Sequence, residues 1–123
     1  MIEPITSEQF EALKFKLESH GFIKAIIVSG SMAPIISVGE KILIESIQSF
    51  AELKPFDIIA FWDGDKIICH YLVGHSEIKS TEPTLLTKGL RSSFDLPIGA
   101  SQILGKVNRR IPLFYKIRQA FSI

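Results

Sequence analysis

The sequence has one cysteine and no long apolar run. Cys69 has no second cysteine for an internal disulfide, and no group of cysteines and histidines has the spacing of metal ligands. No apolar segment approaches the roughly 18–20 residues that span a bilayer. The first ten residues, MIEPITSEQF, lack the basic start and the apolar core of a signal peptide. We therefore expect a cytoplasmic protein that needs no metal and no organic cofactor.

Neither sign of charge dominates the chain. Fourteen Lys and Arg stand against 13 Asp and Glu, which gives a formal charge of +1. This balance gives no support to a general nucleic-acid surface. Apolar residues make up 46% of the 123 residues and the mean hydropathy is +0.27, which is high for a single soluble domain. We therefore expect exposed apolar surface that meets a peptide, a partner or a membrane face.

Residues 6–20 have the pattern of an amphipathic helix. Thr6 and Gln9 fit a capping box, and Gly21 is a typical C-terminal stop. Three apolar residues share one face of this helix at helical spacing: Phe10, Leu13 and Leu17.

From Phe22 onward the pattern changes to short strands rich in Ile and Val. The runs FIKAIIV, KILIESI, DIIAFW, KIICHYLVG, PTLLTKG and QILGKV are separated by turn residues. Asp63-Gly64 predicts a hairpin that pairs residues 57–62 with 66–73. The segment 89–100 reads as irregular. The sequence thus predicts one mainly β domain, a coiled antiparallel sheet or partly open barrel over 22–107, with helices at 1–21 and 108–123.

The run VSGSMAP, residues 28–34, interrupts two strand candidates. A serine hydroxyl becomes a nucleophile only when a base takes its proton and donors face the developing oxyanion. Gly30 would let the backbone turn tightly and present Ser31 at a strand end. Ser29, two positions earlier, would lie on the same side. Taken alone, however, Ser-Gly-Ser is most often just a turn.

The order of several such runs gives this turn a context. Five runs occur in one order within roughly residues 25–107: SGSMAP, VGEKILIE, KPFDIIAFWDGDKIICHYLVG, LLTKG and ILGKV. In this order the chain resembles the type I signal peptidases and their relatives, the self-cleaving repressors of the SOS response. The resemblance implies the signal-peptidase catalytic-core fold, with Ser31 as the nucleophile. It implies an oxyanion hole formed by the Ser31 N–H and the Ser29 hydroxyl, a loop shaped by the substrate-binding residues Met32 and Pro34, and small residues beside the scissile bond.

His70 stands where most of these families have a catalytic lysine, and a histidine there is similar to the endoplasmic-reticulum type of signal peptidase. A lysine must be shifted far from its free pKa of about 10.4 to act as a base, whereas histidine starts at about 6.5. Imidazole is therefore available near neutral pH without extreme burial. The competing interpretation is an ordinary core or edge histidine. Cys69 should point to the opposite face of the strand, into the core.

The third member of a triad is less clearly marked. The family box usually reads Thr-Lys-Gly-Asp-Asn-Asn, followed shortly by aspartates, whereas this chain reads TKGLRSSFD. Asp95 is the one carboxylate left in that segment and lies about one residue short of the family's catalytic aspartate. We expect Asp95 to orient His70. The alternatives are a dyad without a carboxylate, Ser92 or Ser93 as the orienting group, and Asp95 as a surface residue or helix cap.

These observations predict a serine endopeptidase that cuts an extended peptide or precursor protein. A self-cleaving regulator is a second enzymatic interpretation, and it has less support. Residues 1–24 contain no helix-turn-helix motif and no obvious pair of residues at which self-cleavage would occur. A catalytically inactive peptide-binding module is the alternative from another class, and the missing Asp-Asn-Asn favours it.

The tail IPLFYKIRQAFSI has two interpretations. Leu113, Ile117 and Phe121 share a helical face, and Lys116 and Arg118 lie away from it. The first interpretation is a packed terminal helix. The second, which Arg109 and Arg110 also favour, is peripheral contact with an anionic membrane.

Overall fold

The computed structural model describes residues 4–76 and 83–122. Its first element is α1 (Ser7–His20), which begins at the capping box of Thr6 and Gln9 and ends at Gly21, where φ is +84°. Phe10 and Leu17 bury the inner face of this helix. The sequence prediction for α1 is confirmed to within one residue.

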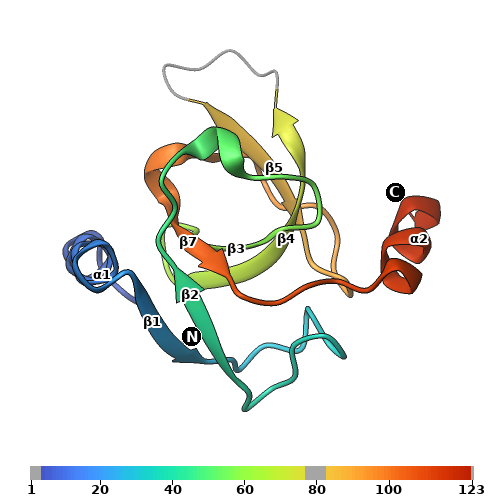
Figure 1. Ribbon diagram of the computed structural model, residues 1–123, viewed down its shortest axis with the longest axis horizontal. Coiled ribbons are helices and arrows are strands. Elements are labelled where there is room, and N and C mark those ends of the chain that lie inside the picture. Colours follow the sequence, from blue (N-terminus) through green and yellow to red (C-terminus); the bar gives the residue numbers. More distant parts are fainter. Residues whose placement is uncertain (1–3, 77–82, 123) are drawn as a thin grey trace.

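Among the described residues, seven strands form one antiparallel sheet that curls into a half-barrel (Figure 1). The sheet order is β1-β2-β7-β3-β4-β5-β6. The strands are β1 (Phe22–Ile26), β2 (Lys41–Glu45), β3 (Ile58–Trp62), β4 (Ile67–Ser76), β5 (Thr84–Lys88), β6 (Ile98–Gly99) and β7 (Ile103–Val107). The mainly β prediction is confirmed, and so is the hairpin at Asp63-Gly64, because β3 and β4 pair from Trp62↔Ile67 to Ile58↔Tyr71.

The predicted irregular segment 89–100 contains one short strand. In β6, Ile98 and Gly99 pair with Leu85 and Thr84 of β5. Ile98 is buried with Leu85 in a cluster on one face of the sheet. Two residues are too few for a periodic signal, which explains why the sequence pattern did not reveal this strand.

Both faces of the sheet are covered. The larger core cluster lies on the side of α1 and includes Phe10, Leu17, Ile44 and Tyr71. The second cluster lies on the other face. Its members come mainly from alternate positions of β3, β4 and β5: Ile59, Phe61, Leu72 and Leu85. The central strand β3 is therefore buried on both sides, and it fixes the position of its neighbour β4.

The C-terminal helix α2 (Leu113–Ser122) is shorter than the predicted 108–123. Ile111 precedes Pro112, and a residue before proline is disfavoured in the α conformation. The Pro112 carbonyl then accepts from the N–H groups of Tyr115 and Lys116 and opens the helix. The tail forms a packed terminal helix, as in the first interpretation, because Gln119 is buried and Tyr115 packs against the larger core cluster. Its apolar residues Leu113, Phe114, Ile117 and Phe121 are nevertheless exposed. No helix in the described part of the chain is long and apolar enough to cross a bilayer.

Candidate active site

Ser31 lies in the loop after β1, where two buried neighbours hold the backbone. The side chains of Met32 and Ile36 enter the larger core, and the Ile36 N–H donates to the Met32 carbonyl over 3.0 Å. The loop is also tied to the far side of the site, because the Ser31 carbonyl accepts from the Arg91 N–H over 2.9 Å. The Ser31 side chain is left partly exposed at the surface of a firmly anchored turn.

Gly30 does not adopt the backbone conformation that favours glycine. Its φ lies outside the left-handed region, and a Cβ atom there would meet only the Val38 side chain, at 4.0 Å. The expected conformational need for glycine at position 30 is therefore not observed.

His70 meets Ser31 from β4. Its Nε2 atom lies 2.9 Å from the Ser31 Oγ atom, at hydrogen-bond distance. The ring is buried and packs edge-on to Phe61, with the ring centroids 6.3 Å apart. Pairing of Ile59 with His70 in the β3–β4 hairpin sets the height of the ring along the strand.

Asp95 completes a continuous line of side chains. Its Oδ2 atom lies 2.6 Å from the His70 Nδ1 atom. Ser92, one of the two alternative partners, is engaged elsewhere: its hydroxyl accepts from the Gly89 N–H and donates to the main-chain carbonyl of Ser93, the other alternative. Asp95 is the carboxylate that the structure places against the second ring nitrogen.

Thr87 holds Asp95 at two points. Its hydroxyl donates to Asp95 Oδ2 over 2.8 Å, and its carbonyl accepts from the Asp95 N–H over 3.0 Å. An isolated bridge between Lys88 and Phe94 fastens the same loop to the end of β5. The sequence pattern predicts no role for Thr87. The one signal that could have identified it is its place in the TKG run.

Gly89 is the second residue that sequence reasoning missed. A Cβ atom at this position would lie 2.4 Å from Ser92 Oγ and 2.9 Å from His70 Nε2, both far inside contact distance. It would also lie 3.1 Å from the Ser31 carbonyl. The site therefore requires glycine at position 89 because the backbone passes directly over the imidazole.

Ser29 lies beside the Ser31 hydroxyl, on the side where the sequence analysis expected it. Its Oγ atom lies 3.3 Å from both Ser31 Oγ and Ser31 N, donating to the first and accepting from the second. The Ser29 hydroxyl and the Ser31 N–H are thus gathered on one side of Ser31 Oγ. Each can donate to an oxygen that approaches that side.

A cavity of about 270 Å³ opens next to Ser31 and His70. Its walls come from two segments: residues 27–36 around Ser31, and residues 66–70, which end the hairpin turn and begin β4. Met32 therefore lies where a substrate-binding role was expected. Pro34 is exposed and lines a neighbouring hollow together with residues of the 88–93 segment.

Cys69 and His70 take alternate sides of β4, as their spacing predicts. Cys69 packs against the larger core and is only partly buried, because its edge reaches the cavity. Burial raises the pKa of the Cys69 thiol to about 11. The thiol therefore stays protonated at neutral pH and is a poor nucleophile.

The other two histidines lie outside the site. His20 is the last residue of α1, and His75 Nε2 lies 3.2 Å from the Leu53 carbonyl. Across residues 4–76 and 83–122, no three His, Cys, Asp or Glu side chains are grouped so that they could hold a metal ion.

The chain was compared with known proteins in three ways. Searches against protein-family models, curated proteins and solved structures gave no match.

Proposed function

We propose that this chain is a serine endopeptidase of the signal-peptidase type. Ser31 is the nucleophile, His70 is the general base, and Asp95 orients and stabilises the imidazole. The observation that carries the proposal is the line of contacts from Ser31 Oγ to His70 Nε2, 2.9 Å, and from His70 Nδ1 to Asp95 Oδ2, 2.6 Å. The order of the sequence motifs and the curled antiparallel sheet support the family assignment.

The hydrogen-bond partners define the tautomer that the reaction needs. Asp95 Oδ2 already accepts from Thr87, and an ionised carboxylate has only acceptor capacity, so the proton of this pair belongs on His70 Nδ1. His70 Nε2 then carries the free lone pair. That atom accepts the hydroxyl proton of Ser31.

In the first half of the reaction, Ser31 Oγ attacks the carbonyl carbon of the scissile peptide and its proton passes to His70 Nε2. The carbonyl oxygen becomes an oxyanion, which accepts from the Ser31 N–H and the Ser29 hydroxyl. When the C–N bond breaks, His70 Nε2 returns the proton to the leaving amine. The product of this half is an ester on Ser31.

In the second half, a water molecule attacks the ester carbonyl and gives its proton to His70 Nε2. The same two donors receive the second oxyanion. The ester bond then breaks, and Ser31 Oγ takes the proton from His70. The peptide leaves with a new carboxyl group, and the site returns to its starting state.

The open side of the half-barrel supports an extended substrate. β1 pairs with β2 on one edge, and residues 67–70 of β4 pair with β3, whereas β5 pairing starts only at Tyr71. Within the described residues β1 is an edge strand of the sheet, and residues directly after β1 and at the start of β4 line the cavity. A peptide in β conformation between them would add main-chain hydrogen bonds and bring its scissile carbonyl to Ser31. The family resemblance adds small residues next to that bond.

The test is cleavage of a library of short unstructured peptides, with the products mapped by mass spectrometry. Wild-type protein should cut a subset of the library, Ser31→Ala should cut none, and the exposed-site control Ser37→Ala should cut as wild type does. Fluorescence anisotropy of the same peptides measures binding separately. Wild-type protein that binds peptides without cutting them would establish the inactive binding module and overturn the protease. Cleavage that survives in Ser31→Ala would also overturn it.

A further inference from the structure

The helix α2 is attached to the protein by Tyr115, which packs against the larger core cluster, and by a buried polar network. The side chain of Gln119 is buried, and its Oε1 atom accepts from Lys88 Nζ over 2.7 Å and from the Tyr71 hydroxyl over 2.9 Å. Its Nε2 atom donates to the Leu90 carbonyl over 3.1 Å. Burial lowers the pKa of Lys88, whose ammonium is enclosed in the same network. This network sets the rotation of α2 about its own axis.

The opposite face of α2 is apolar and turned outward. Leu113 is 71% exposed and Phe121 is 89% exposed, and Phe114 and Ile117 lie between them on the same side. Spacings of one, three and four residues place these four side chains on a single helical stripe. An ordinary surface helix buries its apolar stripe and exposes its polar groups. In α2 the arrangement is reversed, so the stripe is available to an apolar environment outside the protein.

The charge around this stripe has one sign. Residues 108–122 contain four basic side chains and no carboxylate. Lys116 and Arg118 lie on α2 itself, and the Arg118 guanidinium lies over the Phe114 ring at 5.8 Å. The Arg109 guanidinium is paired with the Glu40 carboxylate, which leaves Arg110, Lys116 and Arg118 for an external anion.

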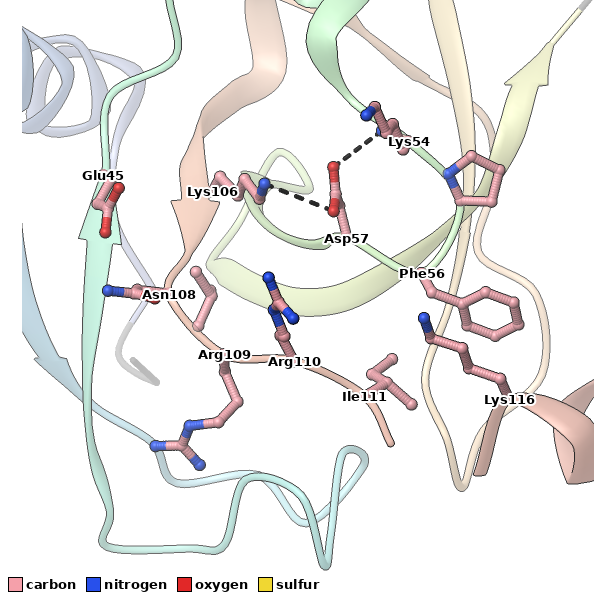
Figure 2. Close-up of a pocket in the computed structure, with 12 residues that line it drawn as sticks. Glu45, Lys54, Phe56, Asp57, Lys106, Asn108, Arg109, Arg110, Ile111 and Lys116 are labelled. Carbon is pink, nitrogen blue, oxygen red and sulfur yellow. Dashed lines mark hydrogen bonds and ion pairs between the residues drawn. The ribbon is translucent and has the colours of Figure 1, made fainter. Parts of the chain in front are cut away.

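A basic pocket adjoins the start of α2. Its volume is about 440 Å³. Its charged lining consists of the basic residues Lys54, Lys106, Arg109, Arg110 and Lys116 and the carboxylates of Glu45 and Asp57, so positive charge is in excess. Figure 2 shows Arg110 directed into this pocket and Lys116 extending alongside Phe56. Lys106 is paired with Asp57 over 3.5 Å. Cationic groups therefore continue from the helix into a hollow large enough for a phosphate group.

We propose that α2 docks on a bilayer surface that contains anionic phospholipid. The stripe Leu113, Phe114, Ile117 and Phe121 enters the boundary between head groups and acyl chains, and Arg110, Lys116 and Arg118 contact lipid phosphates. A helix with one apolar face and basic flanks is the form that lies in this interface. The absence of carboxylates from 108–122 matches the negative surface of such a membrane. The inference is independent of the proposed peptidase activity.

The experiment is flotation of the full chain with phosphatidylcholine vesicles, with or without phosphatidylglycerol. We expect the wild-type protein to float with the anionic vesicles, at least about tenfold better than with phosphatidylcholine alone, and to be released by high salt. Leu113→Ser with Phe121→Ser should remove this binding. The matched control is Phe15→Ser, because Phe15 is 72% exposed on α1 and should bind as wild type does.

Folding and self-association are checked in the same samples. Circular dichroism should match wild type for each variant, because all three side chains are exposed. Three results would overturn the proposal. The wild-type protein could bind neutral vesicles as well as anionic ones, Phe15→Ser could lose as much binding as Leu113→Ser with Phe121→Ser, or the wild-type protein could bind no vesicles. The wild-type protein could also prove to be a dimer that becomes a monomer in the variant Leu113→Ser with Phe121→Ser. That result would assign the stripe to contact with a second copy of the chain and would also overturn the proposal.

Discussion

The Nδ1 atom of His70 lies 2.6 Å from the Oδ2 atom of Asp95, although 25 positions separate the two residues in sequence. His70 is fixed by a regular strand, whereas Asp95 stands in a loop and is held there by Thr87. The accuracy of this contact therefore depends on side-chain and main-chain bonds to the neighbouring strand.

Replacing Asp95 by Asn should nearly abolish catalysis while the protein stays folded. The amide can donate toward Nδ1, which favours the tautomer with the proton on Nε2, where it blocks transfer from Ser31. In Ser-His-Asp systems this change lowers kcat about 10⁴-fold. Steady-state cleavage of the peptide selected from the library measures the effect. Asp65→Asn, in the β3–β4 turn, is the control, and a kcat for Asp95→Asn close to the wild-type value would reduce the triad to a dyad.

Thr87→Val should lower kcat by up to about tenfold, because it removes one hydrogen bond from the Asp95 carboxylate and leaves the shape of the side chain nearly unchanged. The same substitution in the Asp95→Asn background should have little further effect, since both changes act on one contact. A double-mutant cycle on kcat measures this coupling. Full additivity of the two effects would show that Thr87 does not act through Asp95.

Thr84→Val should stabilise the protein by about 1 kcal/mol in free energy of unfolding. Within the described residues, the buried Thr84 hydroxyl has no hydrogen-bond partner, so its removal relieves a desolvation cost. Urea denaturation measures the change. Because Thr84 shares β5 with Thr87, this variant also serves as the control for kcat, which should not move. A loss of stability would mean that the hydroxyl is satisfied in solution.

Gly89→Ala should abolish peptide cleavage by moving the imidazole. The new methyl group would overlap Ser92 Oγ and His70 Nε2, so either the ring leaves Ser31 or the loop shifts away. Gly74→Ala is the matched control, because a Cβ atom there has no neighbour within 4 Å. Cleavage rates and thermal unfolding of both variants make the test. Wild-type activity in Gly89→Ala would refute the packing of this backbone against the His70 ring.

The Cys69 thiol should resist alkylation at neutral pH despite its partial exposure. With the pKa raised to about 11, only about 0.1% is thiolate at pH 8, and the rate should rise about tenfold per pH unit. In denaturant the thiol should react at least about a hundredfold faster at pH 8. Because the unfolded thiol ionises first, stability should fall as pH rises from about 8.5 toward 11. Rapid iodoacetamide labelling of the folded protein at pH 7 would contradict this.

The strands could be predicted from sequence because their signals are local: period-two apolar runs and Asp63-Gly64 mark the sheet. Ser31, His70 and Asp95 could be singled out only from the order of several motifs, because neither Ser-Gly-Ser nor a lone histidine is specific by itself. The position of Asp95 depends on pairing with Thr87, which no periodicity encodes. Likewise, the rotation of α2 follows from Gln119 meeting Lys88 and Tyr71, side chains from elements far away in the chain. Helical spacing reveals an apolar stripe but not the side to which it turns.

The bond from the Arg91 N–H to the Ser31 carbonyl is formed by the main chain alone. Any residue except proline can supply it, so natural selection acting on this contact does not constrain the side chain at position 91. Residues 90–92, which read Leu-Arg-Ser, can therefore change in sequence while the bond to the Ser31 loop persists. Because no side chain takes part in this contact, the amino-acid sequence does not reveal it. Substitutions at position 91 other than proline should leave the hydrogen bond intact.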